Sequence, residues 1–165
     1  MKIRKLKEKD ANRMLIWMHS DESKDIFEKD FSNYSIEDVL NFINYKDDDN
    51  FHYACVDDED NYLGTISLKN VNLNNFNAEL AISFLKEAQG TGAALFAIKE
   101  VLNIGFNQLK LNKIYLNVLS TNARAKAFYK KVGFVKEGCF KKHIRKNNKY
   151  IDLEWYAFFK DSFEF

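Results

Sequence analysis

The segment Gln89-Gly90-Thr91-Gly92-Ala93-Ala94 most limits how this chain can fold, because it leads directly into an apolar stripe. Leu95, Ile98, Leu102 and Phe106 follow at helical spacing, which predicts a long amphipathic helix beginning at this loop. A helix start presents unpaired N–H groups and the positive end of the macrodipole, and glycine lets a ligand approach the backbone. The pattern therefore predicts a pyrophosphate site. Taken alone, such a loop is also typical of a turn that only caps a helix.

Length and composition predict one globular domain, residues 1–165, with 46% hydrophobic and 30% charged residues. Lys+Arg 25 and Asp+Glu 24 nearly cancel, so no overall charge favours nucleic acid or an acidic membrane surface. The charged N-terminus lacks a signal-peptide core, and no apolar run is long enough to span a membrane. Cys55 and Cys139 have no metal or disulfide-scaffold spacing, and the histidines share no spacing. We therefore expect a cytoplasmic protein without a metal.

Hydrophobic periodicity predicts an α/β domain with seven strands and four helices. The strands are expected at residues 3–6, 51–56, 62–68, 78–85, 113–119, 134–140 and 150–159. The helices are expected at 10–19, from 35 to a polar turn at 47–50, after the glycine loop, and at 122–131. The order β-α-α-β-β-β-α-β-α-β-β predicts a mixed sheet whose helices form crossovers. The polar segment 141–149 is expected as the tip of the last hairpin.

A second motif joins Asn122 to the stretch AFYKKVGF at residues 127–134. With the glycine loop, it resembles the GCN5-related N-acetyltransferase (GNAT) superfamily, whose acetyl-CoA loop reads Gln/Arg-x-x-Gly-x-Gly/Ala. Glu137-Gly138 and Tyr150-Ile151-Asp152 further resemble the subgroup of ribosomal-protein-alanine and polyamine N-acetyltransferases. The likeness runs over nearly the whole chain. The chain differs just before the loop, where Lys86-Glu87-Ala88 stands in place of the proline and aromatic residues of many relatives.

The resemblance implies a three-layer domain with a mixed, mostly antiparallel sheet, and direct acetyl transfer from acetyl-CoA to a primary amine. It implies that backbone N–H groups of the loop hold the pyrophosphate, and that a bulge in the preceding strand faces the pantetheine arm. The implied cofactor-binding residues are Ile82, Ser83, Phe84, Gln89, Gly90, Thr91, Gly92, Ala93, Ala94, Asn122, Ala125, Lys126 and Tyr129. The side chains of Ile82 and Phe84 are also candidates for the core.

Tyr129 is the candidate general acid for the departing thiolate, because a phenol with a pKa of about 10 is protonated at neutral pH. It follows Asn122 by two helical turns, so both side chains face the same way. Glu79 is the candidate general base, acting through water on the ammonium of the acceptor. Two alternatives stay open. Glu79 also suits the solvent face of an alternating strand, and Phe128-Tyr129 also suits simple packing.

An acidic cluster could attract a cationic acceptor, although a solvated loop or helix face is the favoured interpretation. Its members are Asp21, Glu22, Asp25, Glu28 and Asp30. The acceptor therefore stays open between a polyamine, an amino sugar and a peptide N-terminus. The basic segment 141–149 and the aromatic residues at 155–159 allow contact with another chain, including a homodimer. The alternative function is a non-catalytic acyl-CoA sensor or an interaction module on the same fold.

Overall fold

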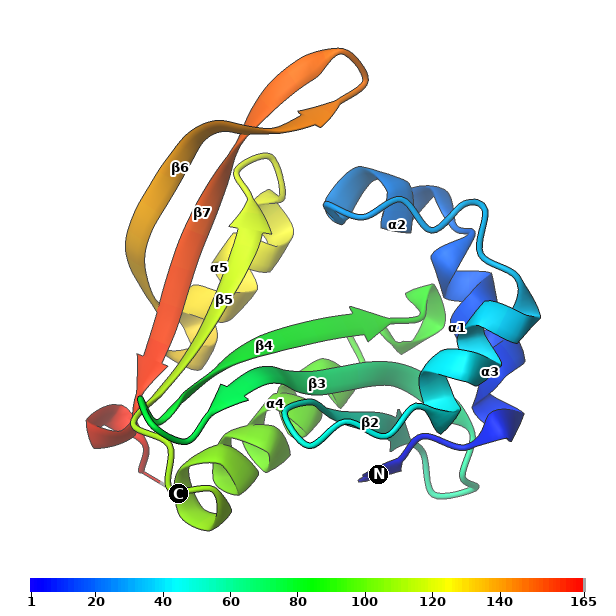
Figure 1. Cartoon of the computed structure of the whole chain (residues 1–165), viewed down its shortest axis with the longest axis horizontal. Helices are drawn as coiled ribbons and strands as arrows, with labels where there is room; N and C mark the ends of the chain where they lie inside the picture. The colour runs from blue at the N-terminus through cyan, green and yellow to red at the C-terminus, as the bar shows by residue number, and fades with distance from the viewer. Residues whose placement is uncertain (165) are drawn as a thin grey trace.

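In the computed structural model, residues 1–164 are described and form one seven-stranded sheet with helices on both faces (Figure 1). The strands are β1 (Lys2–Lys5), β2 (Phe51–Val56), β3 (Tyr62–Asn72), β4 (Asn77–Phe84), β5 (Lys113–Leu119), β6 (Val135–Lys146) and β7 (Lys149–Phe159). The helices are α1 (Ala11–Met18), α2 (Asp21–Ile26), α3 (Ile36–Asn44), α4 (Ala93–Asn103) and α5 (Ala123–Val132). Shorter 3-10 turns lie at Glu8–Asp10, Lys86–Ala88 and Lys160–Ser162, and a π turn at Ile104–Gln108 extends α4.

The strand order is β1-β2-β3-β4-β5-β7-β6, with antiparallel pairs except for β4 and β5, which run parallel. This confirms the predicted mixed, mostly antiparallel α/β fold. The helix α2 was not predicted. It has only six residues, and the side chain of Ser20 caps it by accepting the N–H of Ser23.

The sheet opens between β4 and β5, which separate soon after they begin (Figure 1). Residues 77–79 of β4 pair with residues 113–115 of β5, and within the described chain the two strands pair no further. The edge of β4 that faces β5 therefore carries backbone groups without a strand partner after Glu79. Such unpaired N–H and C=O groups are available to an extended ligand.

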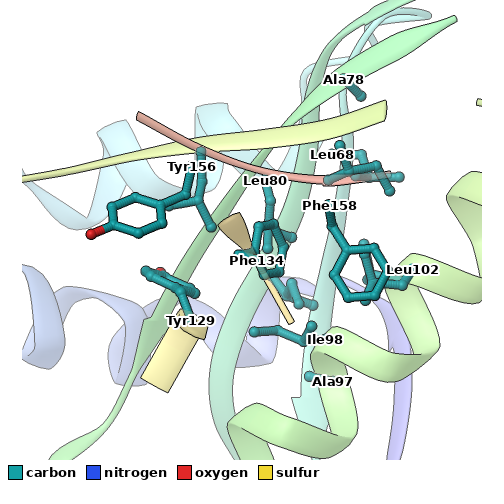
Figure 2. Close-up of a cluster of buried hydrophobic side chains, with 14 of the residues drawn as sticks. Leu68, Ala78, Leu80, Ala97, Ile98, Leu102, Tyr129, Phe134, Tyr156 and Phe158 are labelled. Carbon is teal, nitrogen blue, oxygen red and sulfur yellow. The ribbon is translucent and has the colours of Figure 1, made fainter. Parts of the chain in front are cut away.

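The helix α4 covers one face of the sheet and forms the main core there (Figure 2). Ile98, Leu102 and Phe106 are fully buried, which confirms most of the predicted apolar stripe. The prediction is wrong for the first residue of the stripe, because Leu95 is 37% exposed. Leu95 belongs to the first turn of α4, where it lines a cavity in place of packing on the sheet.

The opposite face of the first strands is covered by α1 and α3. Met14, Trp17 and Val39 from these helices pack against Ala54 and Val56 of β2. This second cluster places α1, α3 and the chain between them beside the opening of the sheet.

The hairpin of β6 and β7 is longer than predicted, since the polar segment 141–149 is largely strand. Its turn is Asn147-Asn148, whose φ angles of 48° and 60° suit asparagine. A register shift lies between Phe140 and Ile144, and Asp152 holds it by accepting the N–H of Lys142 at 2.8 Å. The polarity of residues along the chain does not report pairing with another strand, which is why the sequence predicts a loop here.

Candidate active site

A cavity of about 1250 Å³ lies where the sheet opens. Its walls come from β4, the glycine loop, the first turns of α4 and α5, and the chain between α1 and α3. Most of the predicted site residues meet here, including Glu79, Gly92, Asn122 and Tyr129.

The glycine loop is built as an anion cradle. Gly90 and Gly92 have φ angles of 75° and 88°, a region that L side chains enter only with strain. A Cβ at either glycine would meet no atom within 4 Å, so the space in front of the loop is open. Within the described chain, five backbone N–H groups here make no hydrogen bond, those of Gly90, Thr91, Gly92, Ala94 and Leu95. Such a set at a helix N-terminus suits a phosphate.

The side chain of Gln89 is bound to protein groups beside this cradle. Its amide donates to both carboxylate oxygens of Glu22 at 2.9 Å, and its oxygen accepts from Arg124 at 2.5 Å. Arg124 also pairs with Glu22 at 2.6 Å. The structure therefore places Glu22 at the glycine loop, whereas Asp21 pairs with Lys24 on the surface. Of the predicted acidic cluster, Glu22 and Glu28 line the cavity, and Asp21 does not.

Tyr129 lines the cavity from α5 and is 8% exposed. Its ring contacts Phe128 and Phe134, and Figure 2 shows it at one side of the buried cluster. Within residues 1–164 its hydroxyl has no hydrogen-bond partner. Burial raises the pKa of Tyr129 above its ordinary value, so the phenol stays protonated at neutral pH.

Asn122 is the N-cap of α5, and its side-chain oxygen accepts the N–H of Ala125 at 3.1 Å. This capping role occupies the oxygen, while the amide N–H groups remain available to the cavity. Asn122, Ala125 and Tyr129 line the same cavity, so the predicted common face of this helix is confirmed.

Three of the predicted residues do not line the cavity: Thr91, Ala93 and Lys126. Lys126 points to β7, where its ammonium lies 3.5 Å from Glu154. One residue along a helix turns the side chain by about 100°, which separates it from Ala125. The hydroxyl of Thr91 donates to the carbonyl of Ala88 at 2.7 Å and shapes the loop from within.

The bulge that the resemblance implies at residues 82–84 is absent from the described β4. Its pairing with β3 runs without a shift from Glu79 to Phe84, and the bulge lies instead between Lys69 and Asn72 of β3. Phe84 is buried and Ile82 packs against the core, and both also line the cavity. The close contact of Phe84 with Gly64 helps keep this part of the strand regular.

Glu79 sits at the point where the sheet opens, and its side chain is 15% exposed. Its carboxylate pairs with Lys69 at 3.1 Å and accepts hydrogen bonds from Asn70 at 3.1 Å and Asn117 at 3.3 Å. These contacts join β3, β4 and β5. Glu79 is therefore not a simple solvent-facing residue. As a candidate base it is already engaged by three neighbouring side chains.

His52 lines the same cavity, although no motif or spacing predicts a role for it. Its Nδ1 lies 2.7 Å from the hydroxyl of Ser67, and its ring lies against Phe42 with centroids 4.5 Å apart. Burial is the main cause that lowers the pKa of His52. His52 and Ser67 are far apart in sequence and meet only because β2 pairs with β3.

The acetyltransferase (GNAT) domain family matches residues 3–155 of this chain. The chain belongs to the GNAT family. This confirms the resemblance drawn from the glycine loop and the Asn122–Tyr129 motif. The residues that the structure describes hold no group of three or more His, Cys, Asp or Glu side chains placed to bind a metal ion. No helix within residues 1–164 is long and apolar enough to cross a membrane.

Several known GNAT proteins are similar to this chain. Spermidine N(1)-acetyltransferase of Vibrio cholerae is 35% identical over 57% of this chain and 54% of its own length. The putative ribosomal N-acetyltransferase YdaF of Bacillus subtilis is 29% identical over 61% of this chain and 55% of its own length. The chain thus spans about half the length of these two curated relatives.

The fold likeness extends further than the sequence alignments. The crystal structure of the Vibrio cholerae spermidine N-acetyltransferase in complex with CoA and spermine superposes with a TM-score of 0.88 at 25% identity. That comparison covers 97% of this chain and 95% of the other. The GNAT architecture is therefore present across nearly the full length of the chain.

Proposed function

We propose that this GNAT protein is an N-acetyltransferase that moves the acetyl group of acetyl-CoA directly to a primary amine. One observation carries the proposal. The unpaired N–H groups of the glycine loop and the unpartnered hydroxyl of Tyr129 line one cavity, at the opening between β4 and β5. The similarity to a structure that holds CoA and spermine supports the same arrangement for this chain.

Each part of the cavity then has a role in the transfer. The loop N–H groups bind the pyrophosphate, and the unpaired edge of β4 binds the pantetheine arm by backbone hydrogen bonds. The amine attacks the thioester carbonyl, and the carbon–sulfur bond breaks as Tyr129 donates its proton to the sulfur. Asn122 offers its amide N–H groups to the arm at the start of α5.

The names of the relatives suggest two candidate classes of acceptor. Named relatives include spermidine acetyltransferases and a putative ribosomal acetyltransferase, so a polyamine and a peptide N-terminus are both candidates. A dodecameric structure of the Vibrio cholerae enzyme makes self-association worth measuring by light scattering. The free thiols of Cys55 and Cys139 support a reducing compartment, and we propose the cytoplasm.

The first test combines calorimetry with CoA and an assay of thiol release from acetyl-CoA. The acceptors are spermidine, an amino sugar and a short peptide with a free N-terminus. We expect CoA to bind and at least one acceptor to release thiol. Binding of CoA without release for every amine would favour the sensor alternative, and absence of CoA binding would overturn both.

A variant of the loop tests the cradle itself. Gly92→Ala adds a methyl group into the open space in front of the loop and strains a residue at φ 88°, so we expect CoA affinity to fall at least tenfold. Gly138→Ala is the matched control, because its Cβ also meets no atom within 4 Å and its φ is not positive. Calorimetry of both variants decides the matter. Equal CoA affinity in Gly92→Ala and the wild type would contradict the assignment of the cradle.

A further inference from the structure

Three residues from neighbouring strands form a row across the floor of the cavity. His52 of β2 is in register with Ser67 of β3, and Ser67 is in register with Ala81 of β4. Residues in register share a face of the sheet, and all three line the cavity. At a strand spacing of about 4.8 Å, the Cα atoms of His52 and Ala81 are about 10 Å apart.

This row leaves room for a substrate at one end. Ala81 carries only a methyl group, so the surface above β4 is low beside Ser67. It lies on the strand whose far edge is unpaired toward β5, next to the opening that the thioester is proposed to enter. An amine resting above Ala81 would lie between the thioester and the imidazole of His52.

His52 is held in a fixed orientation. Its Nδ1 is 2.7 Å from Ser67, whose hydroxyl has no other side-chain partner in the described structure, and Phe42 packs against the ring. The second ring nitrogen, Nε2, makes no hydrogen bond within residues 1–164. When Nδ1–H donates to Ser67, Nε2 carries the lone pair that accepts a proton.

The carboxylate of Glu79 is a poorer candidate proton acceptor than the imidazole of His52. Lys69, Asn70 and Asn117 already donate to its two oxygens, at 3.1 to 3.3 Å. Taking a proton would break the ion pair with Lys69 that joins β3 to β4 at the opening of the sheet. Glu79 is better suited to fixing that opening than to cycling between protonation states.

We propose that His52 is the catalytic residue that accepts the proton from the ammonium of the acceptor, with Ser67 as the positioning residue for its ring. This rests on the proposed acetyl transfer. The proton passes from the ammonium to Nε2, and the neutral amine attacks the thioester carbonyl. The nitrogen–carbon bond forms, the carbon–sulfur bond breaks, and the thiolate receives a proton from Tyr129. The second amine proton restores Tyr129, and His52 releases its proton to water.

The charges around His52 suit this role. Burial lowers its pKa first and the ammonium of Lys69 lowers it further, while Asp47 before β2 opposes them. Asp38 of α3 and Glu79 of β4 line the same cavity. Because the pKa lies below the ordinary 6.5, the imidazole is neutral at neutral pH and ready to accept a proton.

The test compares His52→Gln with Glu79→Gln, using the acceptor that releases thiol with the wild type. We expect His52→Gln to lower kcat/KM about 100-fold or more at pH 7, with a smaller loss at pH 9, where more of the amine is already neutral. We expect Glu79→Gln to keep the acid limb of the pH profile. Loss of that limb in Glu79→Gln, with His52→Gln close to the wild type, would overturn the proposal.

Two further measurements separate catalysis from folding. CoA affinity and the melting temperature should be preserved in His52→Gln, and Ser67→Ala should lower kcat/KM less than His52→Gln does. Nitrogen NMR of the wild type reads the ring directly, and we expect protonation at Nδ1 with a bare Nε2. The opposite tautomer would overturn the proposal even if no acceptor were known. A wild type that binds CoA but acetylates no amine would refute the proposed function instead.

Discussion

Tyr129→Phe is expected to lose turnover by 10²- to 10⁴-fold while it binds CoA as tightly as the wild type, roughly the range for loss of a general acid. The substitution removes one hydroxyl that no described group binds, and it leaves the ring contacts with Phe128 and Phe134 in place. The measurements are thiol release under saturating acetyl-CoA and calorimetry with CoA.

The raised pKa of Tyr129 bears on whether a phenol can serve a thiolate. In water an ordinary thiol has a pKa near 8.5 and a phenol a pKa near 10, so the phenol is the weaker acid. Burial of Tyr129 raises the pKa of its phenol further. The same core shows what burial does to a thiol, because desolvation raises the pKa of Cys55 to about 11. A thiolate leaving inside this cavity is destabilised for the same reason, which brings the two groups closer in proton affinity.

Tyr156→Phe provides the matched control. Tyr156 belongs to the same cluster (Figure 2), but it does not line the cavity, and its hydroxyl donates to Glu154 at 2.8 Å. We expect this variant to lose about 1 kcal/mol of stability and to keep its turnover. Equal turnover of Tyr129→Phe and the wild type at every pH would show that water protonates the sulfur.

The parts of the site that the sequence predicted are local in the chain. The glycine loop and α4 are contiguous, and Asn122 and Tyr129 share one face of one helix, so spacing alone brings them together. His52 has no such signal, because its partner Ser67 comes from the next strand. Arg124 is missed for the same reason, since its partner Glu22 comes from the N-terminal part of the chain.

Contacts between elements also explain where the fold differs from the prediction. The helix α2 is too short to show a period, and it depends on the Ser20 cap and on its contacts with α1. The bulge expected near residues 82–84 appears in β3 instead, at a position where Asn70 has a φ of 50°. Register shifts depend on two strands at once, so neither strand alone specifies them.

Phe106→Ala is expected to cost about 3–5 kcal/mol of unfolding free energy, which lowers the melting temperature by roughly 10 °C in a domain of this size. Phe106 is fully buried, and its ring contacts Phe158 and Phe163 with centroids 5.9 and 5.1 Å apart. Removing it leaves a cavity between the end of α4 and β7, which the surrounding chain can close only in part. Denaturant unfolding followed by circular dichroism measures the loss.

Leu95→Ala is the control from the same predicted stripe. Because Leu95 is 37% exposed and lines the cavity, its truncation removes less buried surface and leaves no closed void, and we expect a loss of about 1–2 kcal/mol. Equal losses for the two variants would contradict the observed burial of α4. A small stability loss with weaker CoA binding in Leu95→Ala is the expected pattern. That pattern would show that the first turn of α4 forms the wall of the ligand cavity and contributes little to the core.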